Sequence, residues 1–148
     1  MRGEPVNRLA TIAGIAVFAL VVRGFRSRGL ETSGWGYPAL LATFPVYYWV
    51  FALYAADLAA LPPEILAGIP FLAIAWIAST ARSRWAWWLL AAAYVAHAAY
   101  DFCHDLLVTN AGVPAWWPFF CGSVDVLIGA YIALMAFRPI NPPSGPRR

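Results

Sequence analysis

Apolar residues in this chain are gathered into long continuous runs, separated by short polar connections. Five runs are long enough, or nearly long enough, to cross a bilayer: roughly residues 5–22, 37–60, 65–81, 85–107 and 116–137. The pattern predicts an all-α protein in which five transmembrane helices form one bundle. Residues 1–137 would be a single membrane domain, followed by a Pro/Arg-rich tail at 138–148.

Two of the predicted helices contain an internal proline, Pro45 in the second and Pro70 in the third. A proline deep inside a helix in water usually breaks it. In a bilayer, neighbouring helices can satisfy the freed carbonyl group. We therefore expect both helices to continue through their prolines with a kink.

The composition supports a membrane location. The chain of 148 residues is 62% hydrophobic and only 11% charged, whereas soluble domains carry about 25% charged residues. The first apolar run is followed at once by Arg23, Arg26 and Arg28, with no small-residue cleavage site between. We therefore expect it to be a retained helix and not a cleaved signal peptide.

The basic residues define an orientation. Most of them fall on one side of a five-helix arrangement: Arg23, Arg26, Arg28, Arg82, Arg84, Arg138, Arg147 and Arg148. Arg2 and Arg8 fall on the other side. Because positive loops stay cytoplasmic, the N-terminus of this multi-pass protein should face outward and the C-terminus should face the cytoplasm. The arginines that set this orientation account for the net charge of +3. We therefore expect membrane lipids as partners and no nucleic acid.

Aromatic residues agree with this orientation, because tryptophan and tyrosine gather at membrane interfaces. The inner interface is predicted at Trp35, Tyr37, Trp85, Trp87 and Trp88, and the outer one at Trp116 and Trp117. The sequence contains no lysine. This excludes a retinal or pyridoxal Schiff base and a Walker-type phosphate loop, since each needs a lysine amine.

The fourth predicted helix carries a polar stripe formed by His97, Asp101, His104 and Asp105. Asp101 lies about 40° round the helix from His97, and His104 about 20° to the other side. Asp125 of the fifth helix should lie at a similar depth, because that helix returns antiparallel after a short loop. An isolated charge at the bilayer centre costs roughly 2.5–3.5 kcal/mol, so these carboxyl groups require a partner, a proton or a cation.

Imidazole and carboxylate groups together suit a divalent transition metal. The candidate metal ligands are His97, Asp101, His104, Asp105 and Asp125. His97 and His104 are about 10 Å apart along the helix axis, so both cannot bind one ion without distortion. Two histidines on one helix also make bis-histidine haem unlikely to form, and no haem is expected.

Other uses of the stripe stay open. Histidine and buried carboxyl groups can relay protons, or His97, Asp101 and Asp125 can act as general acids and bases on a membrane-soluble substrate. Tyr94, Trp117 and Cys121 are candidates to line an apolar pocket beside them. The structural alternative is a buried hydrogen-bond network that only holds helices together.

The two cysteines are predicted to be free thiols. Cys121 lies four residues before Asp125 and so shares its helix face, whereas Cys103 points away from the polar stripe. A disulfide would need both thiols to turn toward each other. Cys121 is therefore a further candidate as a soft ligand.

Three spaced motifs cover about a quarter of the chain: His97-x3-Asp101-x2-His104, Val113-Pro114-x-Trp116, and Phe120-Cys121-x3-Asp125-x3-Gly129. With these motifs the sequence resembles a family of small bacterial polytopic membrane proteins of unknown function. The helix-borne His-x3-acid pair is also similar to that of sterol isomerases, which implies a sterol or isoprenoid pocket.

These observations lead to three functional hypotheses. The leading one is an intramembrane His/Asp site that binds a metal ion or a proton, with chemistry on a membrane-soluble substrate as an extension. The second is a non-enzymatic accessory subunit of a larger membrane complex, or a homo-oligomer. The third is a sterol- or isoprenoid-binding or isomerase-like protein. Enzymatic and non-enzymatic interpretations both stay open at this point.

Overall fold

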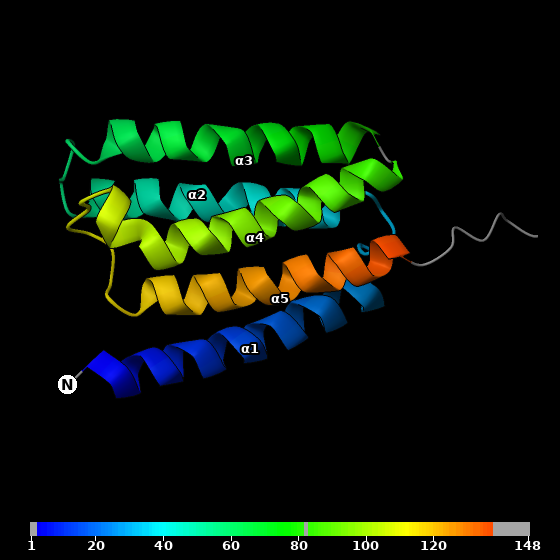
Figure 1. Cartoon of the computed structure of the whole chain (residues 1–148), viewed down its shortest axis with the longest axis horizontal. Helices are drawn as coiled ribbons and strands as arrows, with labels where there is room; N and C mark the ends of the chain where they lie inside the picture. The colour runs from blue at the N-terminus through cyan, green and yellow to red at the C-terminus, as the bar shows by residue number, and fades with distance from the viewer. Residues whose placement is uncertain (1–2, 82, 138–148) are drawn as a thin grey trace, which may run out of the picture.

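The structure is a computed structural model that describes residues 3–81 and 83–137. Within these residues the chain is all-α, as predicted, with five helices: α1 (Gly3–Ser27), α2 (Gly36–Tyr54), α3 (Leu61–Ala81), α4 (Arg84–Leu107) and α5 (Trp117–Phe137). Figure 1 shows the helices running along one common axis in alternating directions. The predicted tail at 138–148 lies outside the described residues.

Helix α4 occupies the middle of the bundle. It packs against α5 on one side and α3 on the other, while α2 packs on α3 and α1 on α5. Figure 1 accordingly shows α1 and α3 at opposite edges of the molecule. The helix with the predicted polar stripe therefore has protein neighbours on both sides.

The second helix ends earlier than predicted, at Tyr54 instead of residue 60. Ala56 adopts a left-handed backbone conformation with φ of 55°. The Asp57 backbone N–H then donates to the carbonyl of Ala52 at 2.9 Å. A left-handed residue followed by such a backbone hydrogen bond is typical of a helix C-terminus. Because residues 55–60 are mostly apolar, their composition did not predict that the helix ends here.

The third helix begins at Leu61, so Pro62, Pro63 and Glu64 lie in its first turn and not in the preceding connection. Prolines are tolerated there because the first N–H groups of a helix have no intrahelical partner. Because Glu64 belongs to α3, its side chain points into the bundle and is only 1% exposed.

Helices α2 and α3 continue through Pro45 and Pro70, as expected. Pro45 also contributes to packing between the two helices. A Cβ atom on Gly68 of α3 would lie 2.9 Å from the Cβ atom of Pro45. The absence of a side chain at Gly68 thus lets the proline of α2 approach α3 closely.

Four of the helices in the described residues are long and apolar enough to cross a membrane: α1 from Val6 to Ser27, α2, α3 and α5. Helix α4 is less apolar because it carries His97, Asp101 and His104. Those side chains are buried, so the polar character of α4 faces protein.

The exposed surface has the opposite character to the interior. Large apolar side chains are exposed on several helices, among them Leu9, Leu20, Leu66, Trp76 and Leu134. Ionisable side chains are buried instead: Glu64, His97, Asp101, His104 and Asp125. Exposed large apolar side chains together with buried ionisable ones are typical of a protein that lies in lipid.

Two aromatic residues predicted for the membrane interfaces are in fact buried. Tyr37 is 1% exposed and Trp117 is 9% exposed. Tyr37 packs on Phe25 and Trp117 on Phe51, with ring centroids 5.0 and 4.9 Å apart, so these two side chains face protein. Other predicted interface residues are exposed: Trp35, Trp85, Trp88 and Trp116.

Helices α4 and α5 approach closely at Gly129. A Cβ atom at this position would lie 3.0 Å from Val95 Cγ2 and 3.1 Å from the carbonyl oxygen of Ala91. Small residues allow helix backbones to meet in this way in membranes. The contact fixes the distance between the two helices that carry most of the buried polar groups.

Replacing Gly129 with leucine should therefore force α4 and α5 apart. We expect Gly129→Leu to lower stability by about 1–3 kcal/mol through overpacking, measured as thermal unfolding in detergent. The matched control is Ala130→Leu, at the adjacent exposed position of α5, which should leave the transition nearly unchanged. Equal stability of the two variants would contradict a tight α4–α5 contact at Gly129.

Candidate metal centre

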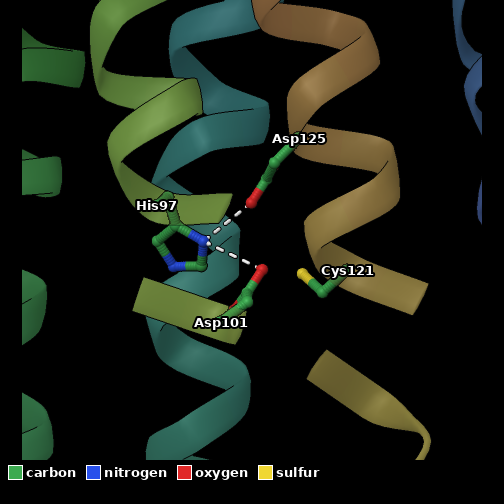
Figure 2. Close-up of side chains that lie close together, drawn as sticks. All are labelled: His97, Asp101, Cys121 and Asp125. Atoms are coloured by element: carbon green, nitrogen blue, oxygen red, sulfur yellow. Dashed lines mark hydrogen bonds and ion pairs between the residues drawn. The ribbon is translucent and has the colours of Figure 1, made fainter. Parts of the chain in front are cut away.

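Four side chains of metal-binding type meet between α4 and α5. His97 and Asp101 come from α4, and Cys121 and Asp125 from α5. One ligand atom from each residue can be chosen so that all four lie within 4.8 Å of one another. Figure 2 shows the four side chains converging from the two helices.

Helix geometry explains how the sequence brings these residues together. In each helix the two residues are four positions apart, so they lie on one face about one turn from each other. The antiparallel packing of α4 and α5 then places the two faces opposite each other. All four side chains are buried, with exposed fractions between 0 and 2%.

A single ring nitrogen lies between the two carboxylate groups. The Nδ1 atom of His97 is 2.7 Å from Asp125 Oδ2 and 3.6 Å from Asp101 Oδ2. The shorter distance is a hydrogen bond between the imidazole ring and the Asp125 carboxyl group. Asp101 is held from its other side, because the Tyr48 hydroxyl donates to Asp101 Oδ1 at 2.6 Å.

Three polar atoms of this cluster have no hydrogen-bond partner among the described residues. They are His97 Nε2, Asp101 Oδ2 and Asp125 Oδ1. Buried polar groups are normally paired, because an unpaired one loses its hydration without compensation. Two buried carboxyl groups therefore lie beside one ring nitrogen, and a cation bound between them would supply the interactions that Asp101 Oδ2 and Asp125 Oδ1 lack.

The donor set identifies the kind of cation that fits. Imidazole, thiolate and carboxylate groups are the ligands of zinc and related transition metals, whereas calcium and magnesium prefer oxygen alone. A tetrahedral zinc ion would hold such ligand atoms about 3.3–3.8 Å from one another. The present separations of up to 4.8 Å require only a small inward movement of side chains.

His104 and Asp105 do not join this cluster, although they belong to the same predicted stripe. His104 Nε2 lies 2.8 Å from Glu64 Oε1. The side chain of Asp105 is 91% exposed, with Oδ1 3.5 Å from His104 Nδ1. The separation agrees with the helix rise, which keeps residues 97 and 104 about 10 Å apart.

Glu64 organises a second buried network. Besides its contact with His104, its carboxylate accepts hydrogen bonds from the Tyr100 hydroxyl at 2.6 Å and from Asn110 Nδ2 at 2.8 Å. The carboxylate thus has three partners, and its charge is well compensated. This network is saturated, in contrast to the cluster around His97.

Tyr48 connects the two networks. Its ring stacks on that of His104, with centroids 4.5 Å apart and planes inclined by 21°. Its hydroxyl group binds Asp101, and its backbone carbonyl accepts from Asn110 Nδ2 at 3.1 Å. One residue of α2 therefore contacts both groups of buried ionisable side chains.

Sequence reasoning placed only part of this site. Glu64, Tyr48, Tyr100 and Asn110 were not predicted as site residues. A glutamate just after two prolines looks like a loop residue, and a tyrosine in an apolar run gives no signal of its own. An asparagine in a connection reads as an ordinary turn residue. Tyr94, predicted as a pocket residue, is buried, and its hydroxyl donates to the Tyr37 carbonyl at 2.7 Å.

Both cysteines are free thiols, as predicted. Cys103 is exposed, whereas Cys121 is buried beside Asp101 and Asp125. Only one of the two thiols is therefore placed to bind a metal.

A scan against models of protein families, a search of the curated proteins and a search of the solved structures found no match to this chain.

The Tyr48 hydroxyl group should contribute measurably to stability. In Tyr48→Phe the ring can still stack on His104, but Asp101 Oδ1 loses its partner in a buried position. We expect a loss of about 1–3 kcal/mol, measured by thermal unfolding in detergent. Tyr54→Phe is the control, because Tyr54 is 89% exposed; similar losses in both variants would contradict the role of the hydrogen bond.

Proposed function

We propose that this chain is an integral membrane protein of the bacterial inner membrane that binds a divalent transition metal, zinc by preference, between α4 and α5. The ligands are His97, Asp101, Cys121 and Asp125. The observation that carries the proposal is their convergence in a buried site where three polar atoms have no partner. The bacterial location rests on the resemblance of residues 97–129 to a family of bacterial membrane proteins.

In this proposal all five helices cross the bilayer, α4 included. Two observations support a transmembrane α4: it lies between α3 and α5, and its polar side chains are buried. The proposed orientation has the N-terminus outside and the C-terminus in the cytoplasm. It rests on the arginines, among them Arg23, Arg26 and Arg28, near the α1–α2 connection.

The metal-free cluster is a proton site. The 2.7 Å contact between His97 Nδ1 and Asp125 Oδ2 holds a proton between imidazole and carboxylate. Metal binding requires deprotonated ligands, so it releases protons from the thiol and from this pair. The function that the cluster supports best is therefore metal binding in exchange for protons, inside the membrane.

Four protein ligands have a further consequence. A zinc ion that binds all four has a closed tetrahedral shell, typical of structural and storage sites, whereas catalytic zinc keeps one position open. The proposal therefore assigns metal binding to this protein. Acid–base chemistry by His97, Asp101 and Asp125 on a lipid-soluble substrate would require one of them to leave the metal.

The metal proposal is tested by loading the chelator-treated, detergent-purified protein with zinc or cobalt. We expect one equivalent of metal and, with cobalt, a charge-transfer band from the Cys121 thiolate. Asp101→Asn and Cys121→Ser should weaken binding by at least about tenfold, the smallest effect seen even for residues that only support metal ligands. Binding should weaken on acidification, because protons compete for the same ligands.

The chain provides matched controls for both variants. Asp105→Asn and Cys103→Ser change the same residue types in α4 outside the cluster, at exposed positions, and should bind metal as the unmodified protein does. Metal elemental analysis and the cobalt spectrum give independent readings. Absence of stoichiometric metal after reloading, or equal loss in the controls, would overturn the proposed centre.

The five-span topology is tested by cysteine labelling in a background where both native cysteines are replaced by serine. Thr32→Cys lies in the α1–α2 connection and Ala111→Cys in the α4–α5 connection, both at exposed positions. We expect a membrane-impermeant reagent to label Ala111→Cys in intact cells and Thr32→Cys only after permeabilisation. Labelling of both from the same side would show that α2, α3 and α4 do not all cross the membrane, and would overturn the five-span topology.

A further inference from the structure

A chain of polar contacts leads from an exposed carboxylate to the buried side chain of Glu64. The Asp105 side chain is 91% exposed, and its Oδ1 atom lies 3.5 Å from His104 Nδ1. The other ring nitrogen of His104, Nε2, lies 2.8 Å from Glu64 Oε1. Glu64 and His104 are each 1% exposed. A single imidazole ring therefore separates the buried carboxyl group from a side chain that water reaches.

The three partners of the Glu64 carboxylate differ in how readily they transfer a proton. Asn110 donates from an amide group, which does not titrate. Tyr100 donates from a hydroxyl group, which releases its proton only in alkaline solution. His104 offers an imidazole, which gains and loses a proton near neutral pH and has two nitrogens for the exchange. Of the three, His104 is therefore the partner suited to deliver a proton to Glu64.

Aromatic rings hold the imidazole of His104 in place. Tyr48 stacks on it, with centroids 4.5 Å apart and planes inclined by 21°. Tyr100 packs edge-on against it, with centroids 5.5 Å apart and planes inclined by 86°. Rotation of the imidazole would have to disrupt both contacts. A proton therefore crosses this ring by binding at one nitrogen while another proton leaves from the other nitrogen.

The polar and titratable groups that face Glu64 and His104 come from three parts of the chain. They are Tyr48 from α2, Tyr100 and Asp105 from α4, and Asn110 from the α4–α5 connection. The two carboxyl groups of Glu64 and Asp105 thus lie at opposite nitrogens of one imidazole. When the ring carries two protons, each carboxylate has an N–H donor of its own. The arrangement therefore accommodates the imidazolium that forms while a proton passes through.

We propose that Glu64 is a proton-binding site that exchanges protons with water through His104 and Asp105. At the start Glu64 is a carboxylate, and His104 is neutral with its proton on Nε2. A proton from the water around Asp105 forms the Nδ1–H bond of His104. The Nε2–H bond then breaks as the Oε1–H bond of Glu64 forms. One proton has entered, the imidazole is neutral again, and the reverse steps release the proton.

This inference goes beyond the proposed metal site, because Glu64 and His104 are not among the proposed metal ligands. It gives the protein a second activity, the uptake of a proton into the interior of the bundle. Asp105 lies in the last turn of α4, beside the α4–α5 connection that the proposed topology places outside. The side from which the proton enters rests on that topology, whereas the route rests on the contacts of His104.

The test follows the arrival of a proton at Glu64 in the full-length protein in lipid nanodiscs. A flash of light releases protons from a photolabile acid, and time-resolved infrared spectroscopy records the C=O band of the protonated carboxyl group. Carbon-13 labelling of glutamate separates this band from those of the aspartates, and Glu64→Gln identifies it. We expect a Glu64 band that grows after the flash. Absence of this band at every pH at which the protein stays folded would overturn the proposal.

Two variants test the route. His104→Gln keeps an amide that can donate to Glu64 but cannot relay a proton. Because a positioned acid–base group speeds proton transfer by roughly 10²–10⁴-fold, we expect the band to grow at least about tenfold more slowly. Asp105→Asn removes the carboxylate on the water side and should also slow the band.

Asp57→Asn is the matched control for Asp105→Asn. The Asp57 carboxylate accepts from the Ala111 backbone N–H at 3.1 Å, and an asparagine oxygen can accept in the same way. This variant should therefore leave the rate unchanged. An unchanged rate in His104→Gln, or equal rates in Asp105→Asn and Asp57→Asn, would overturn the proposed route.

A second measurement on the unmodified protein applies even if His104→Gln fails to fold. Site-resolved nitrogen-15 NMR shows which ring nitrogen of His104 carries a proton at each pH. The relay requires a proton on Nδ1 whenever Glu64 has bound one, because the Nε2 proton has then moved to Glu64. Glu64 in its protonated form beside an Nδ1 atom without a proton would contradict the relay.

The outcomes separate this proposal from the metal centre. Thermal unfolding is measured on every sample as the check of folding, and cobalt binding as the test of the metal centre. A Glu64 band that is slowed in His104→Gln, in a protein that takes up no metal, supports the relay and overturns the metal centre. Cobalt uptake together with an unchanged rate in His104→Gln supports the metal centre and overturns the relay.

Discussion

The fold depends on the contact between α4 and α5, because this contact brings buried ionisable groups within reach of one another. Close approach at Gly129 sets the distance between the helices, and the four-residue spacing on each helix sets the register of His97, Asp101, Cys121 and Asp125. Without such an arrangement each carboxyl group would lie isolated in an apolar environment, where charge is expensive. The close packing of α4 on α5 and the pairing of the buried ionisable groups therefore depend on the same helix contact.

The two buried networks differ in how many hydrogen-bond partners their carboxyl groups have. Around Glu64, one carboxylate receives three donors and is satisfied by protein alone. Around His97, two carboxyl groups lie beside one ring nitrogen. Asp101 Oδ2 and Asp125 Oδ1 have no hydrogen-bond partner among the described residues. The first arrangement is what a structural network requires. The second leaves coordination sites open, and for that reason it is the better candidate for function.

The sequence predicted the five helices of the described residues, because long apolar runs are typical of helices in membrane proteins. It also predicted that His97 and Asp101 would face Asp125, because helix periodicity and an antiparallel return determine that geometry. It did not predict that His104 would pair with Glu64. That contact depends on where α3 begins, and the prolines at 62 and 63 read as a loop although they fit the first turn of a helix.

The position of Glu64 has a consequence for the order in which the protein is assembled. Its partners Tyr100, His104 and Asn110 lie 36, 40 and 46 residues later in the chain. During synthesis, Glu64 therefore leaves the ribosome before any of them does. Until α4 arrives, the carboxyl group must stay at the water interface or be protonated, so the α2–α3 hairpin settles only when the following helix inserts beside it.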